Sequence, residues 1–327
     1  MSNEIAVVTG AGGFIGSRLV ARLLDDGVDV RALVHYGVDG GNGLLGGLSA
    51  ARRRSLDVRA GDLRDADWVR RSLVGAGRVF HLGAIVSIPY SYRSPRDVME
   101  TNVVGTLNVL EAARDAGVPR VIQTSTSEVY GSAQVTPMSE SHPLSAQSPY
   151  AATKIAADQL ALSWFRSFEL PVSIVRPFNT YGPGQSARAI IPTIITQALA
   201  GSSVRLGSVT PTRDFNYVDD TVSAFVAVSE AAAAVGEVFN VGTGVETSVG
   251  RIVELVSASL GKELTVITDE ERVRPAGSEV NRLHADATKL RHICGWEPKV
   301  PVAEGITRTV AWIRENPQRF DPGRYAV

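Results

Sequence analysis

The feature that most limits the fold of this chain is a glycine-rich turn near its N-terminus, TGAGGFIG. The turn follows a β-branched run, residues 5–9, and opens a helical pattern that begins at Phe14. Its three glycines, Gly10, Gly13 and Gly16, suit a tight turn in which the backbone and a helix N-terminus approach a pyrophosphate closely. Because a strand precedes the turn and a helix follows it, the pattern predicts a βαβ unit that binds a dinucleotide.

The rest of the N-terminal half repeats this alternation, which predicts an α/β fold with a doubly wound parallel sheet of the Rossmann type. Several runs are almost wholly apolar, as in strands that are buried on both faces. The predicted strands are 5–9, 28–34, 56–60, 79–82, 118–123 and 172–175, and the predicted helices are 14–26, 66–73, 98–116, 150–168 and 218–233. The glycine-rich segment 37–48 lacks periodicity, which predicts a mobile loop.

After Pro177 the rhythm changes, because prolines punctuate shorter elements. This change predicts a smaller, partly interleaved C-terminal α/β domain that binds the substrate. We expect residues 1–178 and 214–241 to form the dinucleotide-binding domain, and residues 179–213 and 242–327 to form the second domain.

Composition excludes several classes of function. The 327 residues carry 33 basic and 34 acidic side chains, so no overall field would hold the chain on nucleic acid or on a membrane. No run reaches the roughly 18 apolar residues of a membrane span, and the N-terminus lacks the pattern of a signal peptide. A single cysteine, Cys294, excludes an internal disulfide framework and a cysteine-rich zinc site. We therefore expect a cytoplasmic enzyme without a metal, a nucleic-acid partner or a membrane partner.

Tyr150 and Lys154 lie four residues apart at the start of a helical segment, so their side chains share one face. A phenol with a pKa of about 10 is a poor base, and each unit of lowering requires about 1.4 kcal/mol. A buried ammonium group and a positive nicotinamide ring would supply that stabilisation. The run TSTSEVYG, at the end of a predicted strand, adds Thr126, Ser127 and Glu128 as further catalytic candidates.

Together these segments resemble the extended short-chain dehydrogenase/reductase family, which comprises nucleotide-sugar epimerases and dehydratases. RPFNTYGP, RDFNYVDD and RPAGSEVNRLHAD extend the resemblance over most of the chain. It implies that a nucleotide-sugar substrate is held by Asn179, Arg213 and Arg274. It also implies that the cofactor contacts are Gly10, Gly13, Phe14, Ile15, Gly16, His35, Asp62, Leu63, Leu82, Ala84, Asn102, Tyr150, Lys154 and Pro177.

The end of the second predicted strand bears on the choice of cofactor. NAD-dependent folds usually place a carboxylate there, whereas this chain has His35 and Tyr36. Without a carboxylate at this position, no negative charge there would repel a 2′-phosphate. His35 or one of the arginines at 52–54 could contact that phosphate. The sequence therefore favours NADP over NAD.

The family resemblance implies that Thr126 binds the sugar 4-hydroxyl while Tyr150 removes its proton and C4 loses a hydride. C4 epimerases typically lack a carboxylate at the position of Glu128, which could serve as a base for the C5 proton. Ser-Glu resembles 4,6-dehydratases and UDP-glucuronate decarboxylases, whereas dTDP-glucose dehydratases usually have Asp at position 127. The longer run from Ser132 to Ala161 looks most like the UDP-N-acetylglucosamine 4,6-dehydratases of the legionaminic acid type.

We therefore expect a 4,6-dehydratase that gives a 4-keto-6-deoxy sugar, with a 4-epimerase or a decarboxylase as the nearest alternatives. A non-catalytic cofactor-binding protein is an alternative of another class, because a fold does not fix a function. The resemblance also implies a homodimer in which the helices predicted at 98–116 and 150–168 pair with those of a second copy. Ile155, Leu162 and Phe165 would suit that interface, although the same stripe could be core.

Overall fold

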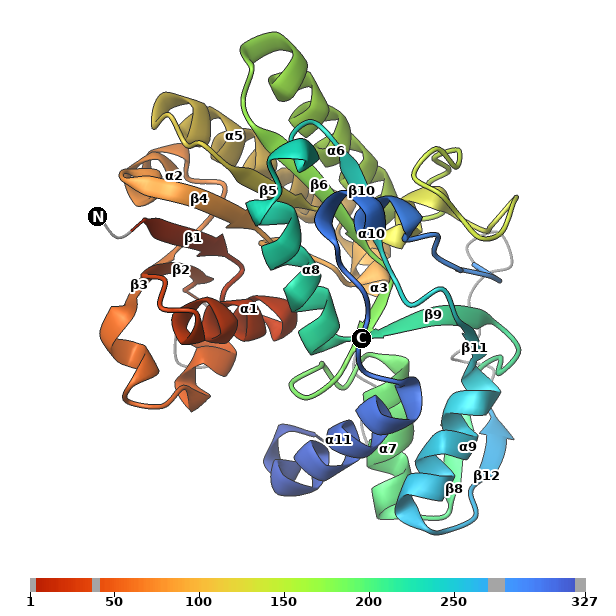
Figure 1. The fold of residues 1–327 in the computed structure, drawn as a ribbon. Helices are drawn as coiled ribbons and strands as arrows, with labels where there is room; N and C mark the ends of the chain where they lie inside the picture. Colours follow the sequence, from red (N-terminus) through yellow and green to blue (C-terminus); the bar gives the residue numbers. More distant parts are fainter. Residues whose placement is uncertain (1–3, 37–41, 270–279, 321–327) are drawn as a thin grey trace.

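The computed structural model describes residues 4–36, 42–269 and 280–320. Within these ranges a seven-stranded sheet has the order β10-β6-β5-β4-β1-β2-β3, and all its pairings are parallel (Figure 1). Its strands are β1 (Ile5–Thr9), β2 (Val30–His35), β3 (Leu56–Gly61), β4 (Ala76–His81), β5 (Val121–Thr124), β6 (Val172–Pro177) and β10 (Val238–Val241). The strand order reverses between β1 and β4, the position at which open α/β sheets bind ligands at their carboxyl ends.

The sheet is buried on both faces, which explains why its strands read as apolar runs. In β1, Ala6 and Val8 join one hydrophobic cluster and Val7 joins another on the opposite face. Helices α1 (Phe14–Asp25) and α8 (Val218–Glu230) contribute to the first cluster, and α2 (Ala66–Leu73), α5 (Gly105–Asp115) and α6 (Pro149–Phe168) contribute to the second. The predicted doubly wound parallel sheet is therefore confirmed.

The predicted bounds hold for β1 and α2 and shift by a few residues elsewhere. The strand predicted at 118–123 begins only at Val121, because Val118 closes the turn after α5 by donating to the Ala113 carbonyl oxygen at 2.9 Å. The single helix predicted at 98–116 is wrong in detail. The chain there forms α4 (Pro95–Met99), a π-helical turn (Glu100–Val104) and α5.

The prediction of a mobile loop at 37–48 is wrong for its described part, while residues 37–41 lie outside the described ranges. Residues Gly43–Gly47 form a 3-10 helix whose Leu45 is buried. Gly43 has a φ of 53°, and a Cβ there would lie 2.4 Å from the Gly12 carbonyl oxygen. Gly43 thus permits close packing against the N-terminal turn, which sequence pattern alone does not distinguish from flexibility.

A smaller part of the molecule holds two further sheets and most of the remaining helices (Figure 1). One sheet has the order β11-β9-β7 and the other pairs β12 with β8. The elements of this part are β7 (Asn179–Tyr181), β8 (Ser203–Leu206), β9 (Thr212–Tyr217), β11 (Glu246–Ser248), β12 (Thr265–Thr268), α7 (Ile190–Ala200), α9 (Val249–Leu260) and α11 (Val302–Glu315). Two further helices pack with the main sheet: α3 (Ile88–Arg93) contacts α6, and α10 (Thr288–Cys294) contacts β10 and α8. The exact domain division stays a prediction.

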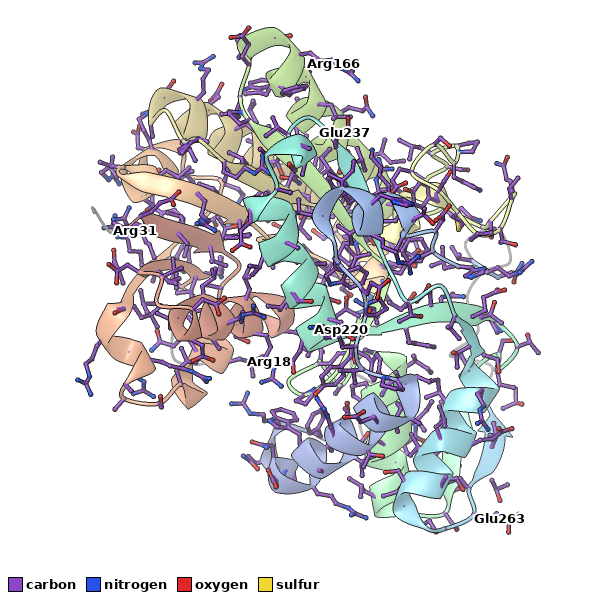
Figure 2. All side chains as sticks on the ribbon, viewed as in Figure 1. Arg18, Arg31, Arg166, Asp220, Glu237 and Glu263 are labelled. Atoms are coloured by element: carbon purple, nitrogen blue, oxygen red, sulfur yellow. The ribbon has the colours of Figure 1, made fainter. Side chains whose placement is uncertain are left out.

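Asp220, labelled in Figure 2, lies in the first turn of α8 and is hydrogen-bonded to the segment between α10 and α11. Its carboxylate accepts a hydrogen bond from the Val300 amide at 2.9 Å. Its carbonyl oxygen accepts one from the indole of Trp296 at 3.1 Å. Asp220 therefore fastens the segment 296–300 to the first turn of α8.

Candidate active site

The residues predicted for the site lie mostly at the carboxyl ends of parallel strands, which meet at one edge of the sheet. The turn after β1, the segment after β4 and the turn after β5 all leave the sheet at this edge. The N-terminal turn of α6 packs beside them. Fold topology therefore brings together residues that are distant in the sequence.

The glycine-rich turn after β1 requires glycine at two positions. Gly10 has a φ of 64°, and a Cβ there would lie 2.8 Å from the Gly83 amide nitrogen. At Gly16 a Cβ would lie 2.3 Å from the Gly10 carbonyl oxygen. Gly13 caps α1 without a side-chain hydrogen bond, and Phe14 and Ile15 open the helix. A turn of this shape could hold a pyrophosphate at the helix N-terminus.

Asp62 lies at the end of β3 beside His35 of β2. Its carboxylate accepts a hydrogen bond from Arg64 at 2.6 Å and lies 3.7 Å from the His35 Nε2 atom. The hydrogen bond from Arg64 lowers the pKa of Asp62 despite partial burial. Sequence reasoning missed Arg64, whose only signal was its place two residues after Asp62. Arg52, one of the three arginines considered for a 2′-phosphate, is bound to Asp25 at 2.7 Å.

The segment after β4 is fixed by Asn102, which lies in the π-helical turn. Its side-chain oxygen accepts from the Ile85 amide at 2.8 Å, and its nitrogen donates to the Ile85 carbonyl oxygen and to Thr153, each at 3.0 Å. Both N–H groups of the amide are thereby used. Asn102 would therefore act on a bound cofactor through the position of Ile85 and Thr153. Leu82 and Ala84, in the same segment, are half-buried.

The packing at Leu63 also shapes this segment. A Cβ at Gly83 would lie 2.6 Å from the Leu63 side chain, and the Leu63 carbonyl oxygen accepts from Asn108 at 2.8 Å. His81, just before, is buried between Thr9 and Thr106, and burial lowers its pKa to about 3. The imidazole is therefore neutral at physiological pH and serves packing here.

Tyr150 and Lys154 lie one turn apart at the start of α6, which Ser148 caps by accepting from the Ala151 amide at 3.1 Å. Only 7% of Tyr150 and 4% of Lys154 are exposed. The Lys154 ammonium donates to the Thr124 carbonyl oxygen at 2.6 Å. Burial lowers the pKa of Lys154 to about 8, and Asp158 opposes that shift.

The lowered pKa predicted for Tyr150 depends on the nicotinamide charge as well as on Lys154, and it stays a prediction. In the protein by itself, burial raises the pKa of this phenol. A hydrogen bond with Thr126 lowers it by less than burial raises it, and the negative charges of Glu128 and Asp158 raise it further. Lowering this pKa therefore requires positive charge beyond what the protein supplies.

Thr126, Ser127 and Glu128 form the turn that follows β5. The Thr126 hydroxyl accepts from the Glu128 amide at 3.2 Å and so begins the 3-10 turn Ser127–Tyr130. Ser127 is buried, whereas Glu128 is half-buried. Thr126 is also hydrogen-bonded to Tyr150, so the turn that carries Glu128 adjoins the start of α6.

Two buried oxygens without a protein partner lie at neighbouring strand ends. One is the side-chain oxygen of Asn179, which begins β7 two residues after Pro177, and the other is the hydroxyl of Thr124 at the end of β5. Buried polar atoms in proteins almost always have a partner. These two orphaned atoms, with the glycine turn, fit a site that binds a polar ligand such as a dinucleotide.

The predicted substrate residue Arg213 lies in β9 and is nearly buried, with a hydrogen bond to the Thr212 carbonyl oxygen at 2.9 Å. Arg274 lies outside the described residues. Ala285, near the end of the same motif RPAGSEVNRLHAD, lies beside β9, where its amide donates to the Asp214 carboxylate at 3.3 Å. The Asp214 carboxylate also accepts from the Gly244 amide at 2.8 Å, so three segments meet next to Arg213.

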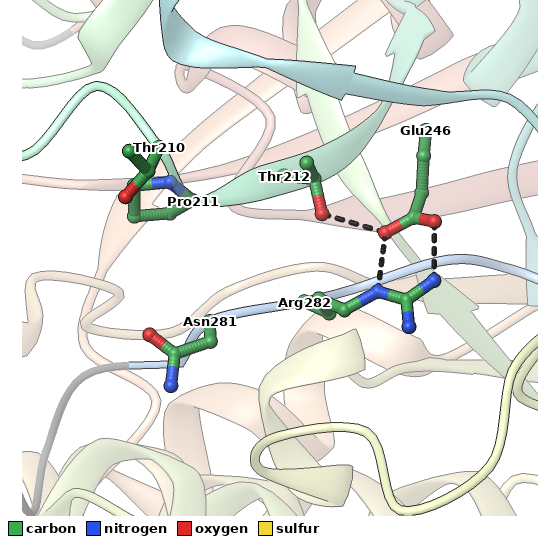
Figure 3. A pocket seen from close by; sticks show the side chains of 6 residues that line it. All are labelled: Thr210, Pro211, Thr212, Glu246, Asn281 and Arg282. Carbon is green, nitrogen blue, oxygen red and sulfur yellow. Dashed lines mark hydrogen bonds and ion pairs between the residues drawn. The ribbon is translucent and has the colours of Figure 1, made fainter.

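A hollow of about 390 Å³ lies beside this junction (Figure 3). Arg282, on its wall, forms two hydrogen bonds with Glu246, at 2.6 and 2.9 Å, and Thr212 donates to the same carboxylate at 2.6 Å. The Arg282 bond lowers the pKa of Glu246 to about 2. The Arg282 charge is thus already paired, and no sequence pattern indicated Glu246 as its partner. The lining residues are Thr210, Pro211, Thr212, Glu246, Asn281 and Arg282.

In the part of the chain that the structure describes, no three His, Cys, Asp or Glu side chains gather in a way that could hold a metal ion. The helices of the described ranges include none with the length and apolar composition of a membrane span.

Comparison with known proteins gives consistent similarities. Residues 7–309 match the family model of GDP-mannose 4,6 dehydratase. A UDP-glucose 4-epimerase of Mycolicibacterium smegmatis is 37% identical over 95% of this chain and 99% of its own length. A dTDP-glucose 4,6-dehydratase of Streptomyces griseus is 35% identical over 97% of this chain and 96% of its own. The crystal structure of DesIV, a dTDP-glucose 4,6-dehydratase from Streptomyces venezuelae with NAD bound, covers 98% of this chain and 100% of its own, with a TM-score of 0.86 and 33% identity.

Proposed function

This chain belongs to the family of GDP-mannose 4,6 dehydratase, among the nucleotide-sugar epimerases and dehydratases of the extended short-chain dehydrogenase/reductase type, and we propose that it is a nucleotide-sugar 4,6-dehydratase. The substrate is a nucleoside diphosphate hexose, and the resemblance to the legionaminic acid type favours UDP-N-acetylglucosamine. The observation that carries the proposal is that Glu128 lies on the same turn as Thr126, with its amide donating to the Thr126 hydroxyl at 3.2 Å, and that Thr126 is hydrogen-bonded to Tyr150.

The residues at the sheet edge fit a nicotinamide dinucleotide. Gly10, Gly13 and Gly16 would hold its pyrophosphate, Asp62 would face its adenosine, and Asn179 has a free buried oxygen near the substrate side. When bound, the nicotinamide ring accepts a hydride and later returns it. NADP stays the favoured form because no acid ends β2, although the similar DesIV structure contains NAD.

The first step is oxidation at C4 of the hexose. Thr126 donates a hydrogen bond to the 4-hydroxyl, and Tyr150 removes the hydroxyl proton as the C4 hydride leaves. Lys154, with a pKa of about 8, is mostly an ammonium group at neutral pH. Its positive charge favours the phenolate form of Tyr150, which burial otherwise opposes.

The second step is loss of water across C5 and C6. The ketone at C4 makes the C5 proton acidic, and Glu128 removes it. Ser127 carries a hydroxyl group, which is not an acid. We therefore assign Glu128 a second role, in which it transfers the proton taken from C5 to the C6 hydroxyl as that group leaves. The hydride taken from C4 then ends on C6 and a proton on C5, which leaves a 4-keto-6-deoxy sugar nucleotide and one water.

A 4-epimerase is the second candidate, because the similar Mycolicibacterium protein has that activity in its name. Mass spectrometry of the product separates the two reactions. We expect UDP-N-acetylglucosamine to lose the mass of one water, and in deuterated solvent to gain deuterium at C5. A product of unchanged mass would refute the dehydratase.

Glu128→Gln tests the role of the base. We expect reduction of the cofactor to persist while water loss falls by about 10²- to 10⁴-fold, the usual contribution of a general base. Glu254→Gln is the matched control, because Glu254 is exposed and pairs only with Arg251 on the surface. Equal water loss by the Glu128 variant and the wild type would contradict the assignment.

The homodimer and the cytoplasmic location also stay predictions. Ile155 and Leu162 pack partly against clusters of their own chain, and Phe165 contacts the backbone at Gly236. Met99 and Val104, on the helical segments that pack beside α6, have exposed apolar side chains. Light scattering after gel filtration would give the number of copies.

A further inference from the structure

A buried ion pair lies beneath the two catalytic elements. Arg176 of β6 donates to one oxygen of Asp158 through two nitrogens, at 3.0 and 3.1 Å, and the side chains are 4% and 0% exposed. The Ser125 hydroxyl donates to the same oxygen at 2.8 Å. Asp158 follows Lys154 by one helical turn and Tyr150 by two, so the three lie along one face of α6.

The other side of Arg176 reaches the turn that carries Glu128. Its Nη1 atom donates to the Tyr130 hydroxyl at 2.9 Å, and its guanidinium carbon lies 5.0 Å from the centre of the Tyr130 ring. The Tyr130 hydroxyl in turn donates to Asn240 of β10 at 2.7 Å. Tyr130 is the last residue of the 3-10 turn that begins at Ser127. One guanidinium therefore joins this turn to α6.

Asp158 also acts on Lys154 by its charge. The carboxylate raises the pKa of Lys154 against the effect of burial. Its second oxygen is buried and has no hydrogen-bond partner. Such a carboxylate is costly for the fold, and burial raises its own pKa even though Arg176 opposes this. An apolar pair would pack here at less cost, so stability alone does not account for these charges.

We propose that Asp158 and Arg176 are positioning residues for this reaction. The pair clamps the turn Ser127–Tyr130 to α6 and supplies the negative charge that keeps Lys154 in its ammonium form. The role of the clamp in holding Glu128 as the base for C5 rests on the proposed function. The effect of Asp158 on Lys154 holds for any reaction that begins with oxidation at C4.

Titration of Lys154 by NMR tests the charge without cofactor or substrate. The chain has four lysines, Lys154, Lys262, Lys289 and Lys299, so each isotope-labelled signal can be assigned by removing one residue at a time. In Asp158→Asn we expect the Lys154 midpoint to fall by about one pH unit or more below the wild-type value. Asp57→Asn is the matched control, because Asp57 pairs with Arg31 on β2 and with its β3 neighbour Arg59. An unchanged midpoint would overturn the electrostatic role.

The pH profile of cofactor reduction gives a second readout. Lys154 is charged below its pKa, so a lower pKa moves the alkaline loss of reduction to lower pH in Asp158→Asn. Asp158→Glu keeps the charge and should restore the wild-type profile. A rate that is reduced equally at every pH, with no displacement of the profile, would indicate a purely structural role and overturn the proposal.

Tyr130→Phe tests the clamp and leaves the ion pair intact. We expect water loss to fall by about 10-fold and cofactor reduction to fall by clearly less, because Thr126 stays held through Ser125, whose amide donates to the Val175 carbonyl oxygen, whereas Glu128 loses the anchor that follows it. Equal losses in both steps would overturn the clamp. If the wild type gives no water loss with any nucleotide sugar, the dehydratase assignment fails, while the Lys154 titration still decides the charge effect.

Discussion

Two arginine–carboxylate pairs in this molecule use the same chemistry in opposite surroundings. The Arg176–Asp158 pair beneath the catalytic turn is 4% and 0% exposed, whereas the Arg282–Glu246 pair beside the hollow of Figure 3 is 51% and 23% exposed. Water and salt screen the second pair, so its charges act weakly beyond their immediate neighbours. The first pair lies in a medium of low polarity, where a charge reaches its neighbours. Burial, and not the pairing itself, decides whether such a pair affects catalysis.

Replacing the arginine of each pair by methionine should give the largest contrast. Arg176→Met leaves Asp158 buried and unpaired, and we expect it to lower the free energy of unfolding by about 3–5 kcal/mol. Arg282→Met should cost about 0–1 kcal/mol. Urea unfolding followed by circular dichroism measures both, and similar losses at the two sites would remove the basis of the comparison.

Substrate affinity should distinguish the paired Arg282 from its neighbour Arg213. Arg213 is nearly buried and is proposed to bind the diphosphate, so Arg213→Met should raise KM by about 10- to 100-fold, the value of charged hydrogen bonds. Arg282→Met should change KM by less than about 2-fold, since Glu246 already neutralises that charge. Initial rates over a range of nucleotide-sugar concentrations give both values. An equal rise would make Arg282 a second diphosphate ligand.

The smallest expected effect is on stability in acid. The Arg282 bond lowers the folded-state pKa of Glu246 from its usual 4.5 to about 2. An acid with a lowered pKa stabilises the fold above its unfolded pKa, and this contribution is lost as pH falls. The stability advantage of wild type over Glu246→Gln should therefore shrink between pH 4.5 and about 2. A difference that stays constant over that range would contradict the assigned ion pair.

The main sheet was predictable from the sequence because its strands are buried on both faces and its first turn has a single structural solution. The smaller sheets were not predictable. β11 has only three residues, and β12 is a β-branched run of only four exposed residues, TVIT, outside the regular alternation of strands and helices. Their pairing partners, β9 and β8, lie more than thirty residues earlier in the chain.

The candidate catalytic residues were found because their types and spacing carry chemistry on their own. Asp158 and Arg176 were missed for the opposite reason. In the sequence Asp158 looks like a polar residue on a helix surface, and Arg176 looks like part of the motif RPFNTYGP. Only the packing of α6 against β6 brings the two side chains together. The single available signal was the spacing of Tyr150, Lys154 and Asp158, which places a carboxylate on the catalytic face of the helix.

The late return of the chain to the main sheet limits how such proteins can be recombined. α8 packs against α1, and β10 pairs with β6, although β7, β8 and β9 intervene in the sequence. A chimaera of two relatives with one breakpoint after β6 would pair α1 of one parent with α8 of the other. Exchange of sugar preference between homologues would therefore need breakpoints on both sides of α8 and β10, so that each parent keeps its own sheet intact.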